Sequence, residues 1–155
     1  MSRRSDPIDR ARRFCEAFGA AVPICEAPMA GSSSVRRATA VASAGGVAGF
    51  GAYTSSPDAI RAWAAAFRSA AGTAALQINL WVPGPPPRSD ATQEAAMRAF
   101  LSRWTPGGNF DASPPEPLPD FGSQGRALLE ARPRIVSSTM GLFPPAFVDK
   151  LRAWT

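Results

Sequence analysis

The fold of this chain is decided by the stretch PICEAPMAG, residues 23–31, which three serines follow at residues 32–34. The stretch predicts a short buried strand, about Pro23 to Ala27, that ends abruptly in a turn of small residues. The serines predict the start of a helix, because serine is a strong helix N-cap. Ligands of parallel α/β proteins bind at the carboxyl ends of the strands. This turn is therefore also the expected place of the chemistry.

Strand-helix units continue along the chain. Further strands are predicted at 47–53, 75–82 and 134–140, and they are apolar on both faces, as buried parallel strands are. Alternation of strands and helices predicts a parallel sheet covered by helices. A closed (β/α)₈ barrel needs eight units and typically about 250 residues. Four units therefore leave two architectures open, an open four-stranded sheet and a half-barrel with exposed strand edges.

A helical excursion over about 83–133 interrupts the units. Its first helix is capped by Asp90, and its helical spacing predicts one buried apolar face, formed by Met97, Phe100, Leu101 and Trp104. A proline-rich irregular stretch is expected at 105–120, and a second helix at 124–131. After the last strand, Pro145 opens a helix that is expected to turn Trp154 inward.

Composition and charge limit the partners of the chain. Hydrophobic residues make up 45% of the 155 residues, which supports a packed interior, and the net charge of +5 is carried by scattered arginines. A nucleic-acid partner would need that charge on one face, so none is predicted. No apolar run approaches the roughly 18 residues of a membrane span, so no membrane partner is predicted either. The spacing of Cys15 and Cys25 predicts no metal site and no disulfide framework, which favours a reduced, cytoplasmic location.

The chain contains no histidine. A Ser-His-Asp set, an imidazole base and a histidine metal ligand are therefore excluded for this polypeptide acting alone. Glu26 is a lone carboxylate, and nothing in the sequence pairs it with a second acid. No catalytic residue is predicted.

Two features are candidates for holding a planar ligand at the strand ends. In the turn Ala27, Pro28, Met29 and Ala30, the proline fixes the backbone and the small neighbours let a flat ligand approach the main chain. The alternative is an ordinary tight turn with Met29 as a core residue. Asn79 lies near the end of the third strand, where its amide would suit a heterocycle with alternating donors and acceptors. The alternative is an amide that caps a neighbouring loop.

Glycines and hydroxyls give weaker indications. Gly45 and Gly46 predict a helix stop rather than a dinucleotide fingerprint, and Gly51 is a candidate for leaving room above the strand ends. Ser137 and Thr139 end the fourth predicted strand, where their hydroxyls would either face a ligand or hydrogen-bond the turn.

Several motifs follow one another in a set order along the chain. They are PIxxAPMAG at 23–31, AGGVxG at 44–49, SP at 56–57, INLxVP at 78–83 and LLExRPxIVS at 128–137, followed by Gly141, Leu142 and Pro145. In order and spacing, from about Phe14 to the last residue, they resemble the nitronate monooxygenase family, formerly called 2-nitropropane dioxygenases.

The resemblance implies an FMN-dependent TIM barrel that oxidises alkyl nitronates with molecular oxygen. It implies cofactor-binding roles for the main chain of Ala27, Pro28, Met29 and Ala30, and for Asn79. It further implies that residues 1–155 form a single incomplete barrel domain, the first four β/α units, with an insertion at about 83–133. Related FMN-dependent enoyl reductases share these motifs, so such a reductase fragment is an alternative.

The resemblance also has departures. The family's catalytic histidine follows strand five, and its phosphate loops come later still, beyond the units found in this chain. We therefore expect an amino-terminal half of the enzyme, inactive alone. A different class remains open, a non-catalytic half-barrel that pairs with another chain, or with itself, through open sheet edges.

Overall fold

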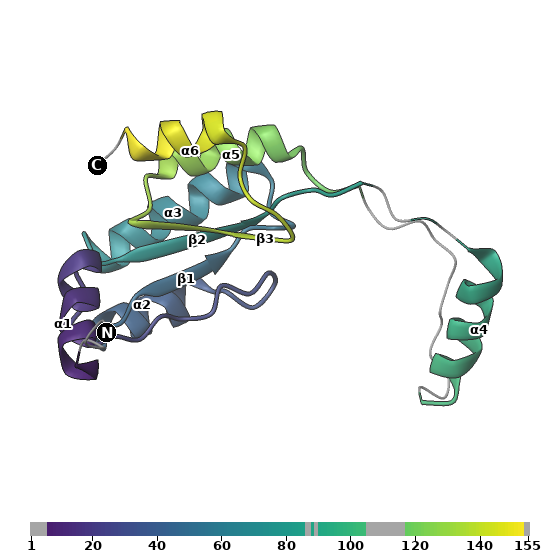
Figure 1. Ribbon diagram of the computed structural model, residues 1–155, viewed down its shortest axis with the longest axis horizontal. Helices are drawn as coiled ribbons and strands as arrows, with labels where there is room; N and C mark the ends of the chain where they lie inside the picture. The colour runs from purple at the N-terminus through teal and green to yellow at the C-terminus, as the bar shows by residue number, and fades with distance from the viewer. Residues whose placement is uncertain (1–5, 86–87, 89, 105–116, 154–155) are drawn as a thin grey trace, which may run out of the picture. The chain divides into compact units, whose positions relative to one another are not determined.

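The computed structural model describes residues 6–85, 88, 90–104 and 117–153 (Figure 1). Its helices are α1 (Pro7–Phe18), α2 (Val35–Ser43), α3 (Pro57–Ala71), α4 (Ala91–Ser102), α5 (Phe121–Ala131) and α6 (Pro145–Arg152). Its strands are β1 (Ala48–Gly51), β2 (Leu76–Trp81) and β3 (Ile135–Thr139). The predicted alternation of strands and helices is therefore confirmed for the units that contain these strands.

Contacts between residues divide the chain into two compact units. The main unit comprises Met1–Pro83 and Leu118–Thr155, and the α4 unit comprises Gly84–Pro117. Helix α5, which the sequence places inside the excursion, belongs to the main unit and packs against α3.

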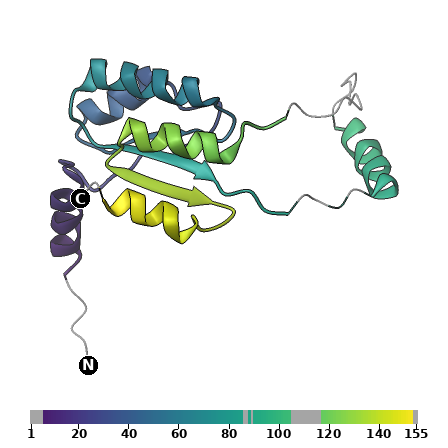
Figure 2. The same ribbon diagram turned by 90° about the horizontal axis from the view of Figure 1, so that it is seen from above.

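The main unit is built on a parallel sheet of three strands in the order β1-β2-β3. The register pairs Phe50 with Ile78 and Ile78 with Val136, so these apolar side chains share one face of the sheet. Figure 2 shows α3 and α5 lying along the sheet. Between sheet and helices lies a core of Ala38, Phe50, Ile60, Phe67, Leu76, Ile78, Leu80 and Leu128. Burying each large side chain there contributes about 1.5–3 kcal/mol, which makes this layer the main source of stability.

The opposite face of the sheet, here called the polar face, has a different character. Gly51, Asn79 and Ser137 are register partners on it, and Trp81 and Thr139 are the next pair along the strands. Its amide and hydroxyl side chains hydrogen-bond one another across β2 and β3. The core therefore lies on one side of the sheet and the chemistry-bearing side chains on the other.

Helix α4 begins at the cap that the sequence predicts, whereas α5 begins at Phe121, three residues before the predicted start at residue 124. The Asp90 side chain accepts from Gln93 N at 3.1 Å at the start of α4. Asp120 begins α5 in the same way, and hydrogen bonds from Ser123 hold the pKa of the Asp120 carboxyl below its usual range. Helix α2 ends before Gly45, whose φ of +86° confirms the predicted glycine stop.

The predicted buried strand at Pro23–Ala27 is wrong. This segment makes only an isolated parallel bridge, between Cys25 and Val47, and Ile24 is 61% exposed. Two prolines bracket the segment, and a proline has no N–H to donate to a ladder. The chain leaves the strand path after Glu26, so the sheet has three strands instead of four.

The predicted burial of the α4 face is also wrong. Met97, Phe100, Leu101 and Trp104 are all exposed, the last at 75%. The physical reason is that α4 is the one described helix of its unit and has no partner element there to pack against. The inward position of Trp154, and most of the irregular stretch expected at 105–120, lie outside the described residues.

Gln124 provides a test of how the main unit positions its strand ends. Gln124 is 3% exposed. Its Nε2 donates to the carbonyls of Tyr53 (2.9 Å) and Ser55 (2.9 Å) in the loop after β1. Gln124→Leu leaves these carbonyls without that donor, so we expect a loss of about 1–3 kcal/mol in the free energy of unfolding, measured with urea. Gln93→Leu on exposed α4 is the matched control. Equal losses in the two variants would contradict the assigned role of Gln124.

Candidate functional site

The segment that follows Ile24 closes the outer edge of β1. Val47 N donates to Ile24 O and Glu26 N donates to Val47 O, both at 2.9 Å. After Glu26, side chains instead of backbone carbonyls accept the hydrogen bonds from β1. Gly49 N donates to Glu26 Oε2 at 2.9 Å, and Gly51 N donates to Ser33 Oγ at 3.3 Å. Two side-chain oxygens therefore satisfy the outward N–H groups that a fourth strand would otherwise bind.

Glycine at positions 49 and 51 lets the turn approach the strand. A Cβ on Gly49 would lie 2.5 Å from Glu26 O, and a Cβ on Gly51 would lie 2.5 Å from Ala30 N. Both neighbours are backbone atoms, which cannot move aside as a flexible side chain does. The room that the sequence predicts above Gly51 is thus filled by the main chain of Met29 and Ala30, which corrects that expectation.

Ser33 fixes the shape of the turn. Its Oγ accepts from Met29 N at 3.1 Å and donates to Met29 O at 2.9 Å, so one hydroxyl closes both ends of the Met29 backbone. Trp63 Nε1 in turn donates to Ser33 O at 2.9 Å. The indole ring stacks on Phe50 with ring centroids 4.3 Å apart. The turn is therefore anchored to the apolar core through Ser33 and Trp63.

Glu26 has a structural partner rather than a second acid. Its side chain is 7% exposed, and Oε1 accepts from Arg37 Nε of α2. With Gly49 N on the other oxygen, both carboxylate oxygens are hydrogen-bonded. Desolvation raises the pKa of the neighbouring Cys25 thiol, so this thiol stays protonated at neutral pH. Neither residue is poised as a base or a nucleophile.

The residues of the turn are mostly exposed. Ala27 and Ala30 are exposed, Pro28 is half-buried and Met29 is 49% exposed, so Met29 is not a core residue. Within the described residues, the N–H groups of Ala27 and Ala30 have no hydrogen-bond acceptor. Ala30 N lies against Gly51, since a Cβ at that glycine would come within 2.5 Å of it.

Asn79 lies beside the turn, one strand further along the sheet. It is 6% exposed and pairs in register with Gly51. Nδ2 donates to Ser137 Oγ at 2.9 Å, and Oδ1 accepts from Thr139 Oγ1 at 3.3 Å. The amide thus bonds hydroxyls of β3 instead of capping a loop. It keeps one N–H and one lone pair for a further partner, because a primary amide has two of each.

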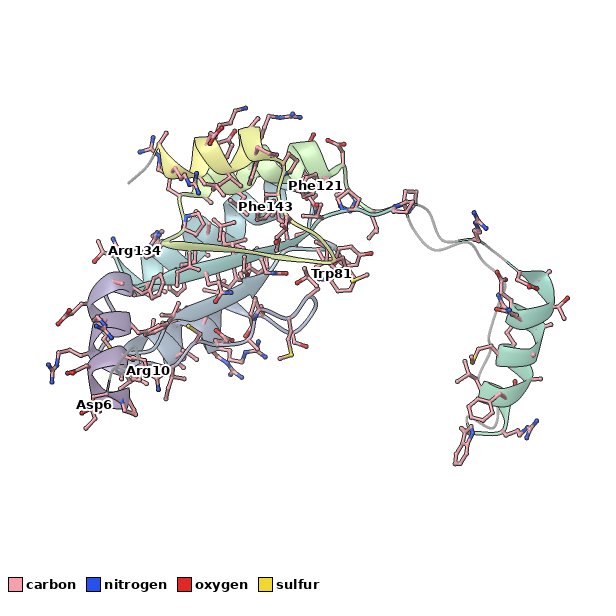
Figure 3. All side chains as sticks on the ribbon, viewed as in Figure 1. Asp6, Arg10, Trp81, Phe121, Arg134 and Phe143 are labelled. Atoms are coloured by element: carbon pink, nitrogen blue, oxygen red, sulfur yellow. The ribbon has the colours of Figure 1, made fainter. Side chains whose placement is uncertain are left out.

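Aromatic rings border the same end of the sheet. Trp81 closes β2 and stacks on Tyr53, with ring centroids 4.3 Å apart and planes 25° from parallel. Figure 3 labels Trp81 at the carboxyl end of β2. Gln124 holds the carbonyl of Tyr53 and thereby fixes the loop that carries this ring.

The five residues predicted to face a cofactor therefore lie at one end of the sheet, joined through Gly51. Sequence reasoning missed Ser33, Arg37 and Gln124, which hold the turn, the carboxylate and the β1 loop. Ser33 is visible in the sequence as part of the serine run at 32–34, but only the folded chain brings it to Met29 and Gly51. In the described part of the chain no group of three metal-ligating side chains occurs, and no helix is long and apolar enough to span a membrane.

The fold belongs to the parallel α/β class and matches TIM-barrel-like solved structures over most of this chain. One is nitroalkane oxidase from Streptomyces ansochromogenes, with a TM-score of 0.71 and 24% identity, covering 90% of this chain. Another is a mutant of FabK from Thermotoga maritima, with a TM-score of 0.61 and 17% identity, covering 91%. The sequence matches no family model and no curated protein.

The likeness covers only part of those larger proteins. The chain spans 39% of the length of the nitroalkane oxidase chain and 35% of the FabK chain. At these identities the likeness extends to the fold alone.

Gly49 and Gly51 provide the test of the turn's geometry. In Gly49→Ala and Gly51→Ala the new methyl group would overlap backbone atoms, so we expect each to lower the free energy of unfolding by about 1–3 kcal/mol or more. Gly84→Ala is the matched control, since a Cβ there has no heavy atom within 4 Å. Urea unfolding of the three variants decides the matter. A control as unstable as the other two would contradict close approach as the cause.

Proposed function

We propose that this chain forms the wall under the isoalloxazine ring in an FMN-dependent oxidoreductase. The observation that carries the proposal is the junction of the turn, Gly51 and Asn79 at the carboxyl ends of parallel strands. There, two unpaired backbone N–H groups and the half-used amide of Asn79 offer donors and an acceptor to one flat ligand. This mixed donor and acceptor set fits the edge of a flavin ring.

Ala27, Pro28, Met29 and Ala30 would hold the ring through their main chain, and Asn79 through its amide. When bound, FMN would supply the capacity to accept an electron pair from a substrate. The residues of this chain orient the ring and shield one side of it. None of them is placed as a proton-transfer base, and the chain has no histidine.

For the whole enzyme we propose oxidation of a small alkyl nitronate with molecular oxygen. The motif resemblance supports this substrate, and one of the similar solved structures is a nitroalkane oxidase. The same fold occurs in FabK, so the fold alone does not choose the substrate. A base and a phosphate site from outside these residues complete this proposal.

Lumiflavin, the flavin ring without its phosphate tail, tests the cofactor site directly. In amide NMR spectra of the ¹⁵N-labelled chain we expect saturable shifts at Ala27 and Ala30 with lumiflavin and with FMN. Both ligands should bind weakly. Lumiflavin has no phosphate, and the phosphate of FMN has no binding site at this turn. The absence of saturable shifts at both amides would overturn the proposal.

A pair of variants distinguishes specific binding of the flavin ring at Asn79 from non-specific binding. Asn79→Leu should weaken the lumiflavin response by about fivefold or more, as expected for the loss of a buried hydrogen bond. Gln77→Leu is the matched control. Gln77 Nε2 also donates to Ser137 Oγ, at 2.8 Å, but lies two residues earlier on β2. Equal weakening in both variants would contradict a direct contact with Asn79.

A non-catalytic half-barrel that pairs with a second copy is the second candidate function. The outer edge of β3 favours it, because β3 ends the strand order and has no neighbour there among the described residues. Val82 N donates to Thr139 O, so the backbone of Thr139 faces β2 and that of Ser138 faces outward. Such an open edge is a template for strand pairing.

Pairing through this edge predicts a dimer in light scattering of the purified chain. Ser138→Pro removes the outward N–H and should return the mass to that of a monomer. Ser138→Val keeps the N–H and should remain dimeric. A monomeric, well-folded parent chain would exclude this candidate function.

A further inference from the structure

A hollow of about 380 Å³ lies at the other end of the sheet, where the strands begin. Arg68, Arg132 and Arg134 line it, together with Phe18 and Thr73. Arg134 directly precedes β3, and Figure 3 shows it at the start of that strand, on the side of α1. Because Asn79 and the turn lie at the carboxyl ends of the strands, this hollow is separate from the flavin site proposed above.

Three helices end at the hollow. Its lining includes the residues that follow α1, α3 and α5, namely Gly19, Gly72 and Arg132. The carboxyl end of a helix carries unpaired carbonyls and a partial negative charge. One function of the arginines is therefore to neutralise these helix ends.

Hydrogen bonds to carbonyls at the helix ends and just beyond α3 hold two of the guanidinium groups in place. Arg68 Nη1 donates to Gly72 O at 3.4 Å and to Ala74 O at 3.0 Å, and Arg68 Nη2 donates to Arg132 O at 3.4 Å. Arg134 Nη2 donates to Ala17 O at 2.9 Å. A guanidinium has five N–H donors, so both groups keep donors beyond these bonds. In the described part of the chain the Arg132 side chain has no hydrogen-bond acceptor.

The arginines carry more charge than the helix ends require. Each helix end contributes roughly −0.5 charge, or about −1.5 for the three, against three full positive charges. No carboxylate lines the hollow within the described residues. The nearby Glu130 is paired with Arg61 instead. A net positive potential therefore remains in a cavity with donors already fixed in position.

We propose that this hollow binds a small multivalent oxyanion, such as the diphosphate group of a metabolite. Guanidinium donors match phosphate oxygens in geometry and charge. The volume lies in the range of about 300–1,000 Å³ that is usual for small-molecule pockets. An extended polyanion would instead need a track of basic residues across one surface, and these three arginines are gathered around a single cavity.

Isothermal titration of the chain with inorganic pyrophosphate tests the site. Saturable binding is expected, weakening as potassium chloride screens the charges. Arg132→Asn removes one free guanidinium, and asparagine tolerates the left-handed backbone found there, with φ at +44°. We expect about tenfold weaker binding, equivalent to about 1.4 kcal/mol for a charge-assisted hydrogen bond.

Arg36→Gln is the matched control, because it removes an equal charge from the exposed surface of α2. It should leave the pyrophosphate affinity within about twofold, since distant surface charges are screened. Arg134→Gln should weaken binding as Arg132→Asn does. If Arg134→Gln fails to unfold cooperatively in urea, Arg132→Asn alone decides, because its side chain holds no other described residue.

Two ligand arms distinguish the source of the oxyanion. Tighter binding of ADP than of pyrophosphate would assign the hollow to a nucleotide, and equal binding would assign it to the diphosphate group itself. No saturable binding of either ligand, or equal weakening in Arg36→Gln, would overturn the proposal. Tighter binding of a single-stranded oligonucleotide, lost equally in all three variants, would also overturn it. Lumiflavin carries no phosphate, so failure of this site and failure of the flavin site are separately visible.

Discussion

The outer edge of β1 is the constraint on which the rest of the main unit depends. A parallel strand at the edge of a sheet exposes N–H groups that need acceptors. Here Glu26 and Ser33 supply those acceptors from a single segment, at Gly49 and Gly51. The same two glycines lack the Cβ atoms that would keep this segment away. Edge closure and turn position are therefore one interaction: a change that moves the turn also opens the strand.

Division of the sheet into two faces links this constraint to function. The apolar face makes the core with α2, α3 and α5. The polar face needs no such layer, because Gln77, Asn79, Ser137 and Thr139 bond to one another. The core and the proposed ligand site thus lie on opposite sides of β2. Sequence changes on one face can leave the other intact.

Most of the local structure could be predicted from the sequence, because it rests on local rules. Asp90 begins a helix, and Gly45 ends one. The position of Asn79 near a strand end also follows from a continuous apolar run. The loss of the first strand has one local cause, Pro28, which has no N–H to continue the pairing. Its other cause could not be predicted, because Glu26 and Ser33 meet Gly49 and Gly51 across more than fifteen positions. The predicted burial of the α4 face was wrong for a different reason. Helical periodicity identifies an apolar face but does not supply the partner that buries it.

The shared hydroxyl of Ser137 has a consequence for the proposed ligand site. Gln77 and Asn79 both donate to its Oγ, so both lone pairs of this oxygen are occupied. The Ser137 hydroxyl can therefore act towards a further partner only as a hydrogen-bond donor. Thr139 is in the reverse state, since its proton is committed to Asn79 Oδ1 and its lone pairs are free. Two neighbouring alcohols on one strand thus have opposite polarity, and a molecule lying across them must present an acceptor to the first and a donor to the second.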